Sequence, residues 1–300
     1  MNGEFKKTAP QAAILVSTLL WGTLWIPLRE LNESGVSGAT ATSLSFLLGL
    51  VVLLPFAAPH ARRILAGGWP LAASGFFLAV CIALYAEGMV RGEVARVLLL
   101  FYLTPVWSTL LARLMLGQPI TRRRVVTIIL GLLGMAVILG DGMSLPLPRS
   151  AADWMGLISG VAWGLAMVYL QRTAARRDFD RIFTALVFLA PIYFLVTLLP
   201  GSRDSIGVEG ALMADWVMIL VTLAVIWMVP VIALTVYGAS RMDPGMVAIF
   251  LMFEVIIGLA SAAWLLDEPF GPREIIGAGF IIAAMLSEIV RQDRPMVSRK

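Results

Sequence analysis

The stretch LLFYLTPVW, residues 99–107, lies in the middle of a long apolar run of the sequence. A proline, a threonine and three aromatic residues interrupt the aliphatic residues at this point. A run of about 20 apolar residues is long enough to cross the hydrocarbon core of a bilayer as a helix. Proline and polar groups are tolerated in such a helix where neighbouring helices or water satisfy the backbone. The stretch therefore predicts a membrane helix that is interrupted near its middle.

The rest of the chain has the same character. Of its 300 residues, 59% are hydrophobic and only 14% are charged, which is not the composition of a soluble domain. Its continuous apolar runs predict helices, because a membrane barrel would show alternating polarity. We expect an all-α integral membrane protein with ten transmembrane helices, at about residues 11–28, 36–57, 69–91, 94–116, 122–140, 152–171, 181–199, 214–239, 244–266 and 273–290.

The loops between these helices differ in charge according to the side on which they lie. Loops assigned alternately to two sides place 17 of the 23 lysines and arginines on the side of both termini, and six on the other. Positively charged loops stay in the cytoplasm. Both termini are therefore predicted to be cytoplasmic.

An internal repeat appears when the sequence is shifted by 150 residues. ALYAEGMVRGEVA (83–95) then aligns without a gap to ALTVYGASRMDPG (233–245), and farther along Pro119 meets Pro269 and Arg123 meets Arg273. The repeat predicts two halves of one membrane domain, residues 1–145 and 146–300. Each half holds five helices, an odd number, so the second half must be inverted. Inverted repeats are typical of transporters.

Two segments, FYLTPVWSTLLARLMLGQPITRRR and LMFEVIIGLASAAWLLDEPFGPREIIGAGF, resemble the signature segments of the drug/metabolite transporter superfamily, in its EamA-type ten-helix exporter branch. The residues Tyr102 to Pro105 further resemble the aromatic amino-acid exporters of that superfamily. The chain departs from the pattern at Val255, where the family often has proline, and at Gln118, where it usually has an acid. The resemblance implies an inner-membrane exporter with a central cavity lined by the first, third and fourth helices of each half.

Glu254 is the sharpest single feature, because it is an acid near the middle of a predicted span. A carboxylate there costs several kcal/mol unless it is protonated or paired, and such residues usually face a cavity. It is either a group that binds protons or amines or a structural acid paired with a neighbouring donor. The 150-residue shift aligns Glu254 with Thr104, so only the second half carries an acid at this position. Any coupling of transport to protons through this acid would therefore be asymmetric between the halves.

Deep aromatic residues are the other candidates for substrate contact, because their N–H and O–H groups find no partner in lipid. Trp21 and Trp163 are preferred, since both halves carry one at matching places; for each of the others, packing is an equal alternative. The predicted substrate-binding residues are Trp21, Trp25, Tyr85, Phe101, Tyr102, Thr104, Trp107, Trp163, Met167, Tyr237 and Glu254. Pro105 and Pro230 are the predicted hinges, because proline kinks a helix.

These features predict a secondary transporter that works by alternating access and exports aromatic or other amphipathic amino acids and related small metabolites or drugs. A multidrug or quaternary-cation exporter of the same fold is the alternative. The sequence contains no filter motif of the kind a channel needs. It also contains neither the His-Glu-x-x-His motif nor the second membrane aspartate that an intramembrane enzyme would need. With no P-loop, one cysteine and one histidine, we expect no ATP use, cofactor or metal site, and no nucleic-acid partner. Whether transport is coupled to protons is left open. The oligomeric state, a monomer or a weak homodimer, is also left open.

Overall fold

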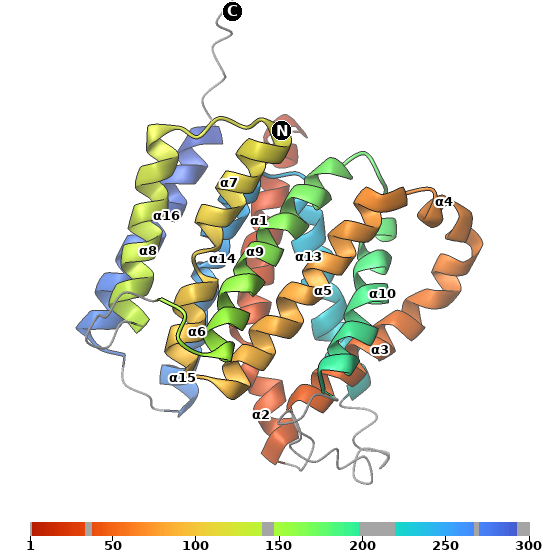
Figure 1. Ribbon diagram of the computed structural model, residues 1–300, viewed down its shortest axis with the longest axis horizontal. Helices are drawn as coiled ribbons and strands as arrows, with labels where there is room; N and C mark the ends of the chain where they lie inside the picture. Colours follow the sequence, from red (N-terminus) through yellow and green to blue (C-terminus); the bar gives the residue numbers. More distant parts are fainter. Residues whose placement is uncertain (1, 34–37, 140–146, 198–219, 267–269, 293–300) are drawn as a thin grey trace, which may run out of the picture.

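The computed structural model describes residues 2–33, 38–139, 147–197, 220–266 and 270–292, and every regular element in these ranges is a helix (Figure 1). The first half contains α1 (Asn2–Gly22), α2 (Trp25–Glu33), α3 (Gly38–Ala57), η1 (Ala58–His60), α4 (Ala61–Leu65), α5 (Gly68–Arg91), α6 (Val94–Phe101), α7 (Thr104–Leu116) and α8 (Arg122–Leu139). The second half contains α9 (Ala151–Arg172), α10 (Asp178–Thr197), η2 (Leu223–Met228), α13 (Val229–Ala239), α14 (Pro244–Leu251), α15 (Phe253–Leu266) and α16 (Pro272–Gln292).

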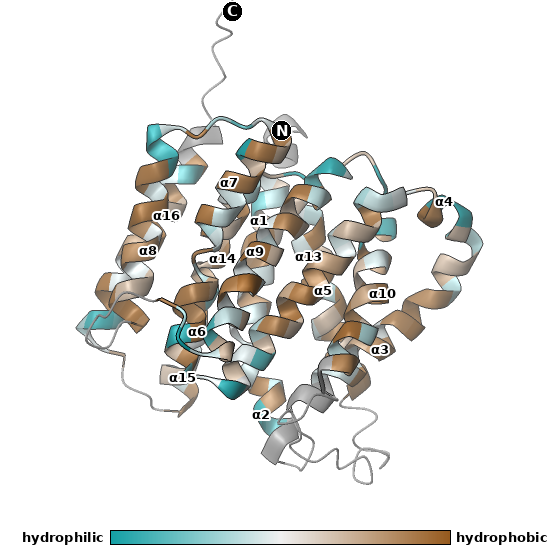
Figure 2. Ribbon diagram, viewed as in Figure 1, coloured by the Kyte–Doolittle hydropathy of each residue, from teal (hydrophilic) through white to brown (hydrophobic). Residues whose placement is uncertain are grey.

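Seven helical segments are long and apolar enough to cross a membrane: Thr8–Glu30, Thr42–Leu65, Gly68–Met89, Val94–Leu116, Ala151–Arg172, Leu220–Ala239 and Pro244–Leu266. The other three predicted spans coincide with α8, α10 and α16, which are helices of 18, 20 and 21 residues. Apolar residues dominate the middle of the bundle and hydrophilic residues gather near its two edges (Figure 2). The described start of α1 and the end of α16 lie at the same edge (Figure 1). The count of ten spans and the cytoplasmic termini stay predictions.

Proline accounts for two of the breaks in the long helices. A proline ring clashes with the carbonyl group four residues earlier and offers no N–H group. Four residues before Pro27 is Thr23, at the break between α1 and α2. Four residues before Pro105 is Phe101, the last residue of α6. The interruption predicted within LLFYLTPVW is thus present as a break between α6 and α7.

The second half shows two further irregularities. Pro230 follows η2, a π-helix that includes Ile226, the residue four positions earlier. Helices α14 and α15 are separated at Met252, although Val255 stands where the first half has proline. Met252 is the 150-residue counterpart of Tyr102, so the break recurs without its proline and is one residue shorter.

Contacts between α8 and α16 repeat with the period found in the sequence. Arg123 of α8 donates a hydrogen bond to the carbonyl oxygen of Ser287, and Arg273 of α16 donates one to the carbonyl oxygen of Val137 at 2.7 Å. Donor and acceptor in the second bond each lie 150 residues from their counterparts in the first. A reciprocal pair of this kind is what a pseudo-two-fold axis between inverted halves produces.

Glycines let the same two helices approach closely. A Cβ atom at Gly134 would lie 2.6 Å from the carbonyl oxygen of Gly277, and one at Gly277 would lie 2.8 Å from the carbonyl oxygen of Gly134. Small residues at such contacts are the usual basis of helix association in membranes. Gly279, by contrast, has nothing within 4 Å of an added Cβ.

We expect Gly134→Ala to lower the free energy of unfolding by about 1–3 kcal/mol, because the added methyl group overpacks a backbone contact that cannot shift freely. Thermal denaturation of the purified protein in detergent measures the effect. Gly279→Ala is the matched control on α16, and it should be neutral or slightly stabilising because alanine favours helix. Equal stability of the two variants would contradict the close approach.

Candidate functional site

A cavity of about 50 Å³ lies where helices of the two halves meet. Its lining residues come from α1, α5, α6, α9, α14 and α15: Trp21, Cys81, Ile82, Tyr85, Phe101, Trp163, Leu251 and Glu254. The first, third and fourth helices of the first half thus contribute, as do the first and fourth of the second. The cavity brings together five of the residues predicted from sequence: Trp21, Tyr85, Phe101, Trp163 and Glu254.

Glu254 stands in the first turn of α15, directly after the break at Met252. The positive end of a helix dipole favours a carboxylate there, by roughly 0.3–1 kcal/mol for an exposed group. Its side chain is half-buried and has no hydrogen-bond or ion-pair partner among the described residues. Because the dipole offsets only part of the cost of a charge in the membrane, the carboxylate needs a proton or a cation. A carboxylate in this position is chemically able to bind either one.

Aromatic rings form much of the wall around this acid. The ring centroids of Tyr85 and Phe101 are 4.5 Å apart. The Trp21 indole N–H donates to Thr235 Oγ1 of α13 at 3.4 Å, which orients the ring. The indole N–H of Trp163 has no partner among the described residues, although the residue is only 4% exposed. Aromatic faces beside a carboxylate suit a solute that carries a positive charge.

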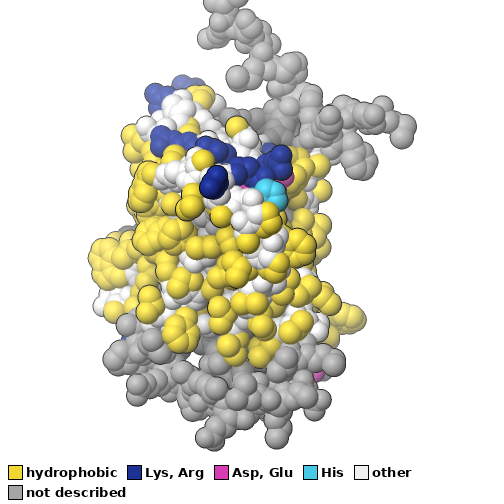
Figure 3. All heavy atoms as spheres, turned by 90° about the vertical axis from the view of Figure 1, so that its right-hand side faces the viewer, with side chains coloured by type: hydrophobic (Ala, Val, Ile, Leu, Met, Phe, Trp, Pro, Cys, Tyr) yellow, Lys and Arg dark blue, Asp and Glu magenta, His cyan; other side chains and the backbone are white. Residues whose placement is uncertain are grey.

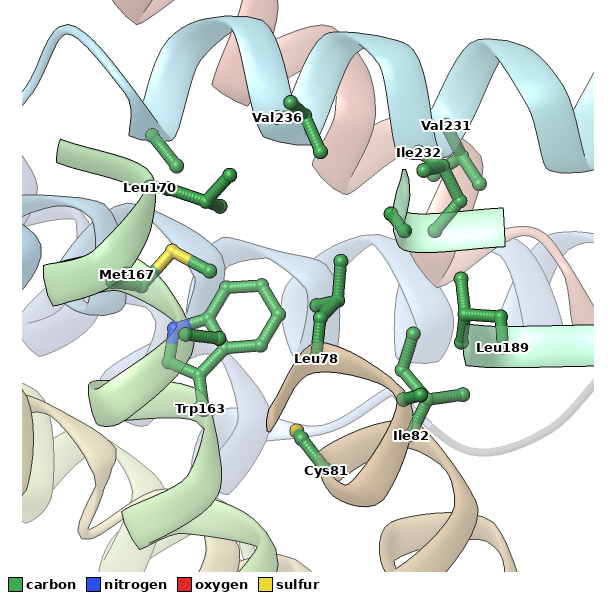
Figure 4. Close-up of a cluster of buried hydrophobic side chains, with 14 of the residues drawn as sticks. Leu78, Cys81, Ile82, Trp163, Met167, Leu170, Leu189, Val231, Ile232 and Val236 are labelled. Atoms are coloured by element: carbon green, nitrogen blue, oxygen red, sulfur yellow. The ribbon is translucent and has the colours of Figure 1, made fainter. Parts of the chain in front are cut away.

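The largest buried cluster of apolar side chains continues from one side of the cavity. Figure 4 shows Trp163 beside Met167 of the same helix, with Leu78 and Cys81 of α5 facing it. Met167 is fully buried in this cluster and does not line the cavity, so its contact with a substrate stays a prediction. Close packing of this kind holds the cavity wall in place.

Three other predicted residues of the fourth helix do not line the cavity. Tyr102 is 1% exposed and packs in a second cluster with Met135 and Met252. Thr104 donates its hydroxyl hydrogen bond to the carbonyl oxygen of Phe101, across the helix break. Trp107 is half-buried beyond the break. Their contact with substrate stays a prediction.

Trp25 and Tyr237 also lie outside the cavity. The Trp25 indole N–H donates to Ser261 Oγ at 3.0 Å, which fastens α2 to α15. The Tyr237 ring lies 4.0 Å from the guanidinium carbon of Arg241, a cation–π contact near the end of α13. Both side chains are therefore engaged in helix–helix or helix-end contacts here.

At the break between α1 and α2, a backbone carbonyl group that the helix leaves free accepts a hydrogen bond from a side chain of η2, which the sequence did not reveal. Around Thr23 the helix tightens, and Leu24 N–H donates to Trp21 O instead of Leu20 O. The freed Leu20 carbonyl accepts a hydrogen bond from the Trp227 indole N–H at 2.8 Å. In the sequence, Trp227 is one of several aromatic residues well inside the predicted spans, and nothing there sets it apart. Its role becomes visible only in the structure, where η2 packs against α1. Cys81, Ile82 and Leu251 were likewise missed, because apolar residues carry no site signal.

A cluster of buried charged side chains lies near the end of α16. Arg124 Nη2 lies 2.8 Å from Asp243 Oδ1 and 3.3 Å from Glu288 Oε2, and Thr127 donates to Glu288 Oε1 at 2.8 Å. Arg124 is 3% exposed and Glu288 1%. Asp243 also accepts a hydrogen bond from Met246 N–H at the start of α14. The cluster ties three segments of the chain together at this edge.

An apolar helical bundle built from two repeats, with a cavity where the halves meet, is an architecture found in secondary transporters. The model of the EamA-like transporter family matches residues 10–140 and again residues 150–287. The chain therefore belongs to the EamA-like transporter family, as its resemblance to the drug/metabolite transporter superfamily indicated, and is a multi-span membrane protein.

Two comparisons agree with this assignment. An uncharacterized transporter of Archaeoglobus fulgidus (strain ATCC 49558) is 28% identical over 169 residues, which cover 56% of this chain and 57% of that protein. The match thus spans a little over half the length of this curated relative. A solved crystal structure aligns with a TM-score of 0.72 over 96% of this chain and 99% of the other. Its identity of 17% shows a shared fold only.

Proposed function

We propose that this protein is a secondary transporter that exports aromatic or other amphipathic amino acids and related small metabolites across the inner membrane by alternating access. One observation carries the proposal: an acid without a partner among the described residues, Glu254, faces a cavity with aromatic walls at the junction of the two halves. Export, rather than uptake, rests on the resemblance to the EamA-type exporters and to the aromatic amino-acid branch.

The chemistry of the wall favours solutes with an amino group. Glu254 supplies the counter-charge, and Trp21, Tyr85, Phe101 and Trp163 supply faces for an apolar or aromatic body. One carboxylate cannot pair with a proton and an ammonium group together. Competition between them at Glu254 would exchange an outgoing amine for an incoming proton, which is the simplest route to coupling.

The cavity is too small for a substrate, so transport requires a change of conformation. A volume of about 50 Å³ holds a water molecule or two, whereas small-molecule sites occupy roughly 300–1,000 Å³. Substrate binding therefore requires the halves to separate from this closed arrangement. At the breaks beside Pro27 and Pro105, at the break at Met252 and at the π-helix beside Pro230, regular helical hydrogen bonding is interrupted and the backbone is less constrained.

A second candidate, export of quaternary ammonium compounds, rests on the charge of the wall. Among the described residues that line the cavity none is basic, so nothing there pairs with the carboxylate of an amino acid. A permanent cation needs only Glu254 and the rings. It also cannot exchange its own proton, which separates the two candidates experimentally.

Counterflow in proteoliposomes tests both. Liposomes preloaded with unlabelled substrate should accumulate labelled substrate from outside, and the effect should saturate. The panel should contain an aromatic amino acid, an aliphatic amino acid, an aromatic quaternary ammonium compound and a nucleotide sugar. We expect counterflow with the aromatic amino acid, with the aromatic quaternary ammonium compound, or with both. We expect none with the nucleotide sugar, because Glu254 repels its negative charges. Counterflow with the nucleotide sugar alone, or flux that does not saturate, would reject the proposal.

A further inference from the structure

An apolar groove of about 490 Å³ opens on the outside of the bundle, between α3, α4, α5 and α10. Its lining is almost entirely aliphatic and aromatic, and it includes Leu54 of α3, Ile64 of α4, Ala72 of α5, and Phe183 and Val187 of α10. The groove is unrelated to the central cavity, because the two share no lining residue.

The surface around the groove is the one that would face lipid. Leu54, Leu65 and Val187, all lining residues, are 52%, 79% and 38% exposed. Figure 3 shows this side of the molecule, with hydrophobic side chains covering its middle and Lys and Arg side chains forming a band along its upper edge. In a bilayer, an apolar depression in such a surface is filled by hydrocarbon.

Arginines are concentrated in two segments next to the groove. Residues 60–66 and 172–181, which form α4 and the connection from α9 to α10, contain six arginines and two aspartates. Arg176 Nη2 donates to the carbonyl oxygen of Ala66 at 2.9 Å, so the two segments are joined. They therefore present their charges at one place.

Both aspartates are already neutralised by other arginines. Asp180 is fully buried and accepts three hydrogen bonds from the guanidinium of Arg63, at 2.7–3.2 Å. Asp178 pairs with Arg181 and Arg241. Burial disfavours the charged form of Asp178, but the hydrogen bonds from Arg241 and Arg181 outweigh it and hold its pKa below the usual value.

This leaves two exposed arginines, Arg62 and Arg177, whose guanidinium groups have no hydrogen-bond or ion-pair partner of any kind among the described residues. Arg62 lies on α4, whose Ala61, Ile64 and Leu65 line the groove. Arg177 directly precedes α10, which supplies the opposite wall. Two unpaired cations on segments that adjoin an apolar groove match an amphipath with one negative head group and a hydrocarbon tail.

We propose that this groove binds an anionic phospholipid, with one acyl chain between α3 and α5 and the head-group phosphate between Arg62 and Arg177. The lipid would replace the side-chain packing missing between these helices and tie α4 to the start of α10. The inference does not depend on what the central cavity transports.

Native mass spectrometry of the delipidated protein, titrated with phosphatidylglycerol or with phosphatidylcholine of the same acyl chains, tests the proposal. The wild type should bind phosphatidylglycerol more tightly. Arg62→Gln with Arg177→Gln should weaken that binding roughly 30-fold, at about fivefold for each charge, and leave phosphatidylcholine binding unchanged. Ala72→Phe should weaken binding of both lipids, because its ring fills the groove.

Two control variants separate the groove from general membrane effects. Arg122→Gln removes an exposed arginine of α8, at the opposite end of the bundle from α4 (Figure 1), and Ala283→Phe adds a ring to an exposed position of α16. Both should bind lipid as the wild type does. Equal wild-type affinity for the two lipids overturns the proposal, as does an unchanged affinity in the double arginine variant. A dimer that Ala72→Phe dissociates, without a change in bound lipid, would assign the groove to a second copy of the chain. If Ala72→Phe does not fold, the arginine variants decide alone, since both side chains are exposed.

Discussion

Glu254→Gln is expected to lower saturable flux in proteoliposomes by between about tenfold and a hundredfold while leaving the protein folded. The amide has the shape of the acid but no charge to offer an amine. A hydrogen bond to a charged group contributes about 1.5–3 kcal/mol, which corresponds to this range of affinity. Because Glu254 has no partner among the described residues, its neutralisation breaks no contact that holds the helices together.

The pH profile gives a second readout of the same variant. If protons and substrate compete for this carboxylate, wild-type flux depends on pH and on an imposed proton gradient, and flux through Glu254→Gln depends on neither. Glu254→Asp keeps the charge and should recover part of the flux. Glu93→Gln, at an exposed acid before α6, is the matched control and should behave as the wild type. A Glu254→Gln protein that still accumulates substrate with the wild-type pH dependence would eliminate the assigned role.

Cys81 allows binding to be separated from transport in these variants. It is the chain's single cysteine and lines the same cavity. Alkylation by N-ethylmaleimide should therefore be slow in the closed arrangement and should be slowed further by bound substrate. Substrate should protect the wild type and Glu93→Gln but not Glu254→Gln.

The largest loss of stability is expected from Arg124→Met, about 3–5 kcal/mol in the free energy of unfolding. Arg124 and Glu288 are almost fully buried, so removing the arginine takes away a cation that lies 3.3 Å from a buried carboxylate. Breaking one partner of a buried ion pair costs about that much. The same change also removes the contact with Asp243, which connects the start of α14 to α8. Unfolding in detergent, followed by circular dichroism, measures the loss.

Two comparisons make this prediction specific. Arg122→Met alters an exposed arginine two residues away and should change stability by less than about 0.5 kcal/mol. Arg124→Met combined with Glu288→Met should recover much of the loss, because a buried pair replaced by apolar groups of similar volume is often neutral or better. If Arg124→Met is no less stable than Arg122→Met, the cluster does not hold these helices together.

Much of the architecture could be predicted from local chemistry. Apolar runs predicted the helices, and irregularities lie beside the prolines at positions 27, 105 and 230, since each ring disturbs the turn four residues earlier. Pro55 and Pro191, which also stand within predicted spans, lie inside α3 and α10 without a break. The 150-residue shift paired Arg123 with Arg273, and the structure shows that the two arginines make equivalent bonds. The break at Met252 escaped prediction, because no proline or glycine there signals it.

The candidate site was predictable only in part. Glu254 and four aromatic residues line the cavity, whereas Tyr102 and Met167, from the same spans as Phe101 and Trp163, are packed elsewhere. Tyr237 lies on α13, which contributes no lining residue. In a soluble helix, polarity shows which face is buried. A membrane helix is apolar on every side, so the pattern contains little information about its rotation.

The sequence by itself therefore determined the class of protein: which segments are helices, that the chain contains an internal repeat, and that an acid stands near the middle of one apolar span of the second half. Each of these depends on the character of residues or on their spacing along the chain. Only the tertiary structure decided which side chains share the cavity, that Trp227 satisfies the Leu20 carbonyl, and that a groove lies between α3 and α5 beside Arg62 and Arg177. Those facts follow from how far each helix is rotated and tilted against its neighbours, and close packing sets that rotation.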